Sequence, residues 1–120
     1  MVIQQGDVVW VNLPSSSGSA PGGRRPAVVM QHDRFNRSRI NTVVVAAVTS
    51  NLKYAHLPGN VRLQKREGGL PRSSVINVTQ IATVDRSALV AKIGQLSKAR
   101  LFAVWDGIRL VLEPSSELSF

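Results

Sequence analysis

The sequence predicts a small domain of mainly β structure, a curved SH3-like barrel of short strands with one helix at its C-terminal end. Two observations support this fold class. Short runs rich in β-branched residues recur at close intervals from residue 6 to residue 96, as is typical of small barrels. After Ser97, apolar residues recur at spacings of three and four, as is typical of an amphipathic helix. The 120 residues, 43% of them hydrophobic, suffice for one compact core, so we expect a single domain over residues 1–120.

The first half of the chain predicts three strands, each bounded by turn-forming or polar residues. They are expected at residues 6–13, 26–31 and 42–48. The third is apolar on both faces, which predicts a central strand. Residues 15–23 contain only Ser, Gly, Ala and Pro, which predicts a flexible loop of the kind that often serves as a lid or binding loop. The basic segment 32–39 leaves room for one helical turn.

The second half predicts further short strands before the helix. They are expected at residues 60–64, 74–78, 80–84 and 90–96. An interruption is expected near Asn77-Val78-Thr79, and residues 65–72 form a turn in which charge is concentrated. Residues 85–89 are compatible with a single helical turn.

The C-terminal helix has clear start and stop signals. Ser97 has the position of an N-cap, and Pro114 stops the helix. One face carries large apolar residues and is expected to pack on the strands. These residues are Leu101, Val104, Trp105, Ile108, Val111 and Leu112. Trp105 is accordingly assigned to the core rather than to a platform for stacked bases.

The charge balance points to an anionic partner. Fifteen Lys and Arg residues oppose seven Asp and Glu residues, for a net charge of +8, and arginine outnumbers lysine by eleven to four. Guanidinium groups match phosphate oxygens better than ammonium groups do. Nucleic acid is therefore the first partner to consider, an acidic protein the second and a membrane surface the third.

Several classes of chemistry are excluded or unsupported. The chain has no cysteine, which excludes disulfides, thiolate zinc sites and a cysteine nucleophile and suits a reducing cytoplasm. The N-terminus lacks signal-peptide features, and the longest apolar run, residues 43–48, is too short for a bilayer. We therefore expect a cytoplasmic protein. No metal-binding or nucleotide-cofactor motif is present, so we expect no metal and no cofactor.

The segment Gly22–Met30 (GGRRPAVVM) contains an arginine whose backbone, and hence side-chain direction, is restricted by its neighbours. Pro26 fixes its own φ and pushes Arg25 towards extended geometry, and an unbroken apolar run follows. We interpret Arg25 as lying at the boundary between a flexible loop and a rigid strand. A surface arginine that merely flanks a strand start is the plainer interpretation.

Cationic and hydroxyl side chains are sufficient to cleave RNA, because each 2′-hydroxyl lies beside a phosphate and can act as the nucleophile. The protein must align that hydroxyl and neutralise the charge that develops on the phosphate. An arginine can do the second task, and a threonine or serine hydroxyl can orient a phosphate oxygen. A histidine pair working as acid and base is the alternative. His32 and His56 stand in no recognisable triad context.

At this point the chain resembles the MazF/PemK family of toxin endoribonucleases, from residue 6 to about residue 112. The order and spacing of five blocks carry the resemblance. They are residues 6–11 (GDVVWV), 22–29 (GGRRPAVV), 48–51 (VTSN), 57–61 (LPGNV) and 74–78 (SVINV), the last leading into Gln80-Ile81.

The resemblance implies an SH3-like homodimer that cleaves single-stranded RNA, usually mRNA, at short sequences without metal. It also implies a cognate antitoxin that covers the RNA groove with a disordered, often acidic segment. The family's catalytic arginine falls on Arg25, and its catalytic serine or threonine falls on Thr49. By this resemblance Arg25 acts in proton transfer and phosphate stabilisation, and Thr49 positions the scissile phosphate.

Further residues are expected to contact RNA from loops around the groove. They are Arg24, Asn36, Arg37, Ser50, Leu57, Pro58 and Gln80. Many relatives carry an acidic residue in the loop before the glycines, but this chain has Gly18-Ser19-Ala20-Pro21. A role for that acidic residue therefore cannot be transferred.

Two other functions compete with an endoribonuclease toxin. One is a gyrase-poison-like toxin on the same fold, although the C-terminal residues show no sign of it. The other is a non-catalytic RNA-binding SH3-like module.

Overall fold

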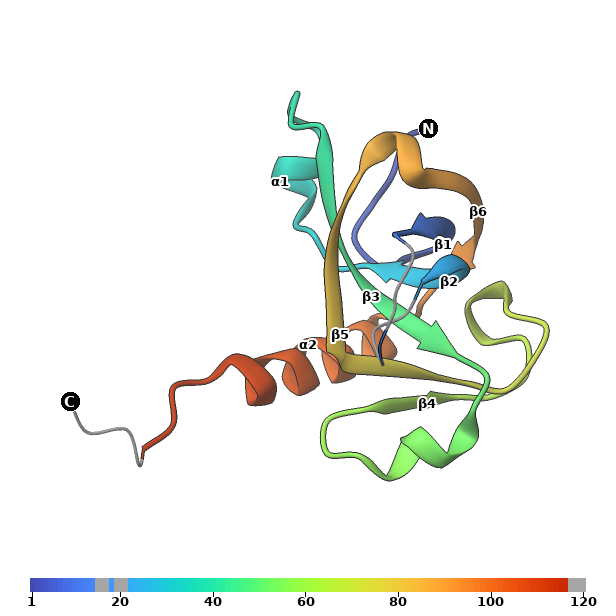
Figure 1. Ribbon diagram of the computed structural model, residues 1–120, viewed down its shortest axis with the longest axis vertical. Helices are drawn as coiled ribbons and strands as arrows, with labels where there is room; N and C mark the ends of the chain where they lie inside the picture. Colours follow the sequence, from blue (N-terminus) through green and yellow to red (C-terminus); the bar gives the residue numbers. More distant parts are fainter. Residues whose placement is uncertain (15–17, 19–21, 117–120) are drawn as a thin grey trace.

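The computed structural model describes residues 1–14, 18 and 22–116. In this part of the chain six antiparallel strands form one sheet in the order β4-β5-β3-β2-β1-β6. The strands are β1 (Asp7–Leu13), β2 (Gly23–Val29), β3 (Thr42–Thr49), β4 (Val61–Leu63), β5 (Ser74–Asp85) and β6 (Leu89–Gln95). The sheet is strongly curled, and the C-terminal helix lies across one side of it (Figure 1). The predicted mainly β fold with a C-terminal helix is confirmed.

Two helices and three short 3-10 turns connect or close these strands. They are α1 (Asp33–Asn36), η1 (Leu52–His56), η2 (Glu67–Gly69), η3 (Arg86–Ala88) and α2 (Lys98–Leu112). The helical turns predicted in segments 32–39 and 85–89 therefore form. Ser97 caps α2 as predicted, with its side chain accepting a hydrogen bond from the Arg100 N–H. Within the described residues, no helix has the length and apolar character that a membrane crossing requires.

The central strands are buried on both faces, because successive side chains of a strand point to opposite sides. Val28, Ala46 and Val48 contribute to a core that also contains Val104 and Ile108 of α2. The intervening residues of the same strands contribute to a second core, with Ile3 and Leu89. In β3, residues 43 and 45–48 are all buried, so both faces of this strand are covered, as the apolar run predicted.

Two strand predictions need correction. β2 begins at Gly23 and not at residue 26, because its pairing with β1 extends to the pair Leu13–Gly23. The predicted strands 74–78 and 80–84 are one strand, β5, with a register shift between the pairs Ala46–Ile81 and Ala47–Asn77. The predicted interruption is thus a bulge that leaves the strand continuous and increases its bend.

The predicted buried face of α2 is wrong at three positions. Trp105 is 53% exposed, Val111 40% and Leu112 67%. The helix faces the sheet through Val104, Gly107 and Ile108, and a Cβ on Gly107 would overlap the carbonyl oxygen of Gly59. This close approach turns Trp105 away from the core. The last helical turn extends past the sheet (Figure 1), which leaves Val111 and Leu112 uncovered.

Candidate active site

An opening between two neighbouring strands creates the candidate site. β2 pairs with β1 as far as Gly23, but its pairing with β3 begins only at Ala27. Pro26 has no N–H to donate to a neighbouring strand. The first residues of β2 and the end of β3 therefore separate, and a groove lies beside this opening.

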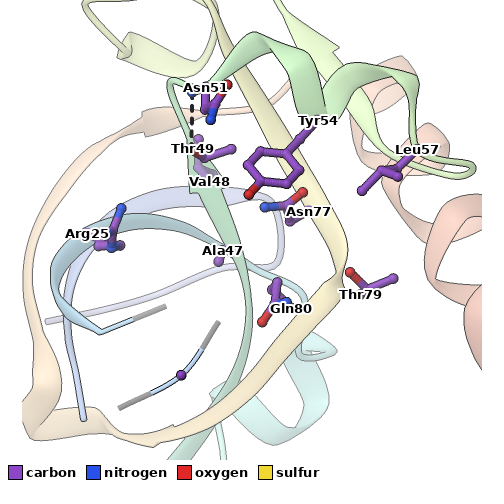
Figure 2. Close-up of a pocket in the computed structure, with 11 residues that line it drawn as sticks. Arg25, Ala47, Val48, Thr49, Asn51, Tyr54, Leu57, Asn77, Thr79 and Gln80 are labelled. Atoms are coloured by element: carbon purple, nitrogen blue, oxygen red, sulfur yellow. Dashed lines mark hydrogen bonds between the residues drawn. The ribbon is translucent and has the colours of Figure 1, made fainter. Parts of the chain in front are cut away.

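The strand register places the two predicted catalytic residues across this opening. Ala27 pairs with Ala47, so counting two residues outward along both strands brings Arg25 opposite Thr49. Side chains two residues apart on a strand share a face, so both lie on the face that carries Ala47. Asn77 of β5 pairs with Ala47 and joins them there. Figure 2 shows Arg25, Thr49 and Asn77 around one hollow.

This hollow, here called the main groove, has a volume of about 690 Å³. It draws residues from β2, β3, η1 and β5, which are distant in sequence. Its lining residues are Gly18, Arg25, Ala47, Val48, Thr49, Asn51, Tyr54, Leu57, Asn77, Thr79 and Gln80. None of these described residues is acidic, so the groove suits an anionic ligand.

Arg25 and Thr49 are both held by hydrogen bonds to the backbone. The Arg25 Nε–H donates to the Gly22 carbonyl oxygen at 3.0 Å, and the two terminal amino groups of the guanidinium have no hydrogen-bond partner among the described residues. The Thr49 Oγ1 accepts from the Asn51 N–H at 3.1 Å. That bond leaves the hydroxyl proton of Thr49 available to donate to an anion.

An amide network orients Asn77 towards the groove. The Asn60 Oδ1 accepts from the Val78 N–H at 2.9 Å, so the Asn60 Nδ2 faces the other way. It donates to the Asn77 Oδ1 at 2.8 Å and to the Tyr54 carbonyl oxygen at 2.9 Å. The Asn77 Nδ2 is therefore left as a donor on the groove side, as Figure 2 shows.

A family model described as "PemK-like, MazF-like toxin of type II toxin-antitoxin system" matches residues 4–112. The chain belongs to this family. Endoribonuclease MazF2 of Mycobacterium bovis is 42% identical over 113 residues, which cover 94% of this chain and 99% of that protein. Endoribonuclease EndoA of Bacillus subtilis is 36% identical over 112 residues, which cover 93% and 96%. This MazF/PemK-family chain is a toxin endoribonuclease.

Solved structures of MazF proteins share the fold. The crystal structure of MazF from Deinococcus radiodurans matches with a TM-score of 0.79 and 26% identity, over 95% of this chain and 99% of that chain. The Mycobacterium tuberculosis toxin MazF-mt6 matches with a TM-score of 0.74 and 19% identity, over 91% and 98%. The curled sheet with a C-terminal helix is thus the MazF fold.

The structure brings most of the predicted site residues of this MazF-like toxin together. Arg25, Thr49, Leu57 and Gln80 line the main groove. Arg24 and Ser50 line a smaller hollow that adjoins it and shares Arg25 and Thr49 with it.

Three predicted RNA contacts lie outside both hollows. Pro58 is exposed beside Leu57 but lines neither. Asn36 and Arg37 also line neither, and Asn36 is 6% exposed. Its amide binds Gln31, whose Nε2 donates to the Thr42 carbonyl oxygen.

Asn36 lies far from the main groove. Gln31, which binds Asn36, also binds Thr42 at the start of the eight-residue strand that Thr49 ends, so Asn36 lies beside the far end of β3, about 23 Å along the strand from Thr49 at 3.3 Å per residue. Arg37 follows α1 and forms an ion pair with Asp33 at 3.9 Å. Arg37 is otherwise exposed, and RNA contacts by Asn36 and Arg37 stay predictions.

The boundary role predicted for Arg25 also changes. Arg25 is the third residue of β2 and pairs with Val11, so a strand and not a loop edge holds its backbone. The expected lid falls mostly on residues 15–17 and 19–21, which lie outside the described residues. His32 accepts from the Arg34 N–H through Nδ1 and caps α1, and His56 lines neither hollow.

Sequence reasoning missed four lining residues with polar side chains, which are Asn51, Tyr54, Asn77 and Thr79. Tyr54 carried a usable signal, because an aromatic residue in a loop beside basic residues is typical of nucleic-acid contacts. Lys53 lies over its ring at 5.9 Å. Asn77 carried no such signal, because its orientation depends on Asn60, which is distant in sequence.

Proposed function

We propose that this toxin cleaves single-stranded RNA by directing the RNA's own 2′-hydroxyl against the neighbouring phosphate, with Arg25 and Thr49 as the catalytic residues. The observation that carries the proposal is the placement of these two side chains on one sheet face, across the opening between β2 and β3. A guanidinium and a hydroxyl facing one another suit a phosphate held between them.

The reaction balances without an added reactant. The 2′-oxygen attacks phosphorus, the bond to the 5′-oxygen breaks, the attacking hydroxyl loses its proton and the leaving 5′-oxygen gains one. The free guanidinium nitrogens of Arg25 stabilise the charge on the non-bridging oxygens, and Arg25 takes part in proton transfer. Thr49 donates its hydroxyl proton to a phosphate oxygen. The products are a cyclic phosphate and a 5′-hydroxyl.

Asn77 is the further donor that we include in this site. Its Nδ2 faces the groove because Asn60 holds its Oδ1. A neutral amide donor in this place orients a phosphate or ribose oxygen without adding charge. Asn77 therefore supplements Arg25 and Thr49.

Base contacts are proposed for the η1 side of the groove. Tyr54 and Leu57 present aromatic and apolar surface there, and Gln80 presents an amide on β5. Aromatic rings stack on bases of any identity, whereas amides read base edges by hydrogen bonds. We thus assign affinity mainly to Tyr54 and sequence preference mainly to Gln80.

The partner proposed for regulation is a cognate antitoxin with an acidic segment. A solved structure described as a mycobacterial endoribonuclease in complex with its cognate antitoxin has a TM-score of 0.71 and 18% identity to this chain. The net charge of +8 favours rapid encounter with an acidic segment as well as with RNA. We place both encounters in the cytoplasm and expect the toxin to form a homodimer.

The test is the cleavage of a long, unstructured RNA by the purified protein in EDTA, with the fragment ends characterised. We expect discrete cuts with cyclic-phosphate ends, and Arg25→Ala should lower the rate at least about 100-fold. Arg39→Ala is the matched control, because Arg39 is an exposed arginine that lines neither hollow. Absence of cleavage by the folded wild-type protein, or full activity of Arg25→Ala, would overturn the proposal and direct the next assay to gyrase inhibition.

A further inference from the structure

A second hollow meets the main groove at the two catalytic residues. This hollow, here called the Trp10 cleft, has a volume of about 320 Å³. Residues of β1, β2 and the end of β3 line it together with residues 70–72 and 74. Because Arg25 and Thr49 line both hollows, a phosphate between them adjoins both.

The two arginines of β2 contribute differently to the two hollows, because Arg25 lines both and Arg24 lines one. Arg24 and Arg25 are consecutive strand residues, so their side chains leave the strand on opposite sides. Arg24 lines only the Trp10 cleft, where its guanidinium lies 5.5 Å from the centre of the Trp10 ring. Pro26 lies two residues after Arg24 and so on the same face of β2, and it pairs with Trp10.

The chemistry of the Trp10 cleft suits a nucleotide. Three arginines line it, Arg24, Arg25 and Arg72, and no acidic residue is among its lining residues. The indole of Trp10 and the guanidinium of Arg24 are planar groups on which a base can stack. Arginine is also the side chain that best matches phosphate oxygens.

The wall that carries Arg72 is held firmly in place. Leu70 is 2% exposed, and its carbonyl oxygen accepts from the Arg66 N–H at 2.8 Å. The Ser74 Oγ donates to the Arg72 carbonyl oxygen at 2.9 Å. The cleft is therefore preformed, which lowers the entropy lost when a ligand binds.

We propose that the Trp10 cleft binds the nucleotide on the opposite side of the scissile phosphate from the main groove. The inference rests on the proposed function. An endoribonuclease cuts an internal bond, so its substrate must continue on both sides of the phosphate that Arg25 and Thr49 hold. The main groove takes one direction of the chain and the Trp10 cleft takes the other. Trp10 and Arg24 contact the base, and Arg72 contacts the next phosphate.

The first test measures how cleavage depends on substrate length. Oligoribonucleotides that contain the mapped cut site are shortened one nucleotide at a time from either end. Removal of the nucleotide in the cleft should lower kcat/KM about tenfold on one side of the cut. Arg72→Ala should cause a similar loss on the long substrate and no further loss on the shortened one, because both changes remove the same contact. Arg39→Ala should match the wild type on both.

The second test needs no cleavage. The chain has two tryptophans, so Trp105→Phe leaves Trp10 as the only one. We expect saturable quenching of Trp10 fluorescence by a long oligonucleotide with a 2′-deoxyribose at the cut site. The shortened oligonucleotide should not quench, and Arg72→Ala should weaken binding of the long one. Loss of activity in Arg25→Ala concerns the proposed function alone, because this assay reports binding.

Three outcomes would overturn the cleft proposal while the proposed function stands. The first is equal quenching by the long and the shortened oligonucleotide. The second is a loss in Arg72→Ala that is the same on both substrates. The third is quenching by an oligoglutamate peptide and not by RNA, which would make the cleft a site for an acidic peptide.

Discussion

Arg24 and Arg25 are neighbours in sequence, yet the strand that carries them directs their side chains to opposite faces. Arg25 lies opposite Thr49 and faces the main groove, whereas Arg24 lies over Trp10 in the Trp10 cleft. A strand separates adjacent side chains in this way because its side chains alternate. At the scale of single residues, this alternation thus decides which of the two arginines reaches the main groove.

The hydroxyl of Thr49 can be tested by an isosteric change. Thr49→Val keeps the β-branched shape but removes the donor, so we expect kcat for RNA cleavage to fall about 100-fold with little change in stability. Thr49→Ser retains the hydroxyl and is the matched control, for which we expect most of the activity. The measurement is single-turnover cleavage of one defined oligoribonucleotide. Equal loss in both variants would argue against a hydroxyl role.

At the scale of elements, η2 is fixed to the rest of the fold by one ion pair and one close packing contact. Arg100 of α2 donates to both carboxylate oxygens of Glu67 at 2.9 Å. Gly69 follows with a positive φ, and a Cβ on it would meet the Ile93 carbonyl oxygen at about 2.5 Å. These contacts join η2 to α2 and β6 and support the wall that carries Arg72.

The Glu67–Arg100 pair predicts a specific pH dependence. The side-chain hydrogen bond from Arg100, followed by the backbone bond from Gln64, lowers the pKa of Glu67 below its ordinary value of 4.5. The folded state therefore favours the carboxylate, so the stabilisation is full above that ordinary value and is lost as pH falls through the lower, folded-state pKa. Glu67→Gln should thus destabilise the protein at pH 7 and much less at pH 2.5.

The expected change in unfolding free energy is about 1 kcal/mol at pH 7, because the pair is bidentate but partly open to solvent. The measurement is urea unfolding of the wild type and Glu67→Gln at both pH values. The pKa of Asp33 is also lowered, but Asp33 is present in both proteins, so its contribution to the unfolding free energy cancels in the comparison. The same difference at both pH values would contradict the assigned role of the carboxylate.

At the scale of the whole molecule, α2 leaves an apolar stripe uncovered. Phe102, Trp105 and Leu112 lie at helical spacing and are 63%, 53% and 67% exposed. Exposed apolar stripes of this kind mark interaction surfaces. We expect a second copy of the chain to pack against this one.

Oligomeric state tests this expectation. Trp105→Glu should convert a dimer to a monomer in light scattering at micromolar concentration, because a charge replaces an apolar contact at the interface. Leu110→Glu is the matched control, since Leu110 is 55% exposed but lies on another side of the helix. A monomeric wild type, or dissociation by both variants alike, would show that the stripe does not hold a dimer.

Local patterns were sufficient to predict most strands, the start of α2 at Ser97 and its end before Pro114, because caps, prolines and side-chain periodicity act within a few residues. They did not predict where β2 begins or that β5 is continuous, because both depend on pairing with neighbouring strands. The resemblance to a known family singled out Arg25 and Thr49, and the register then placed them across one opening. Only the tertiary structure decided which face of α2 is buried, since the contact between Gly107 and Gly59 turns the helix. It also buried Asn36 and oriented Asn77 through Asn60. These features depend on residues that are distant in sequence, and no local pattern records such contacts.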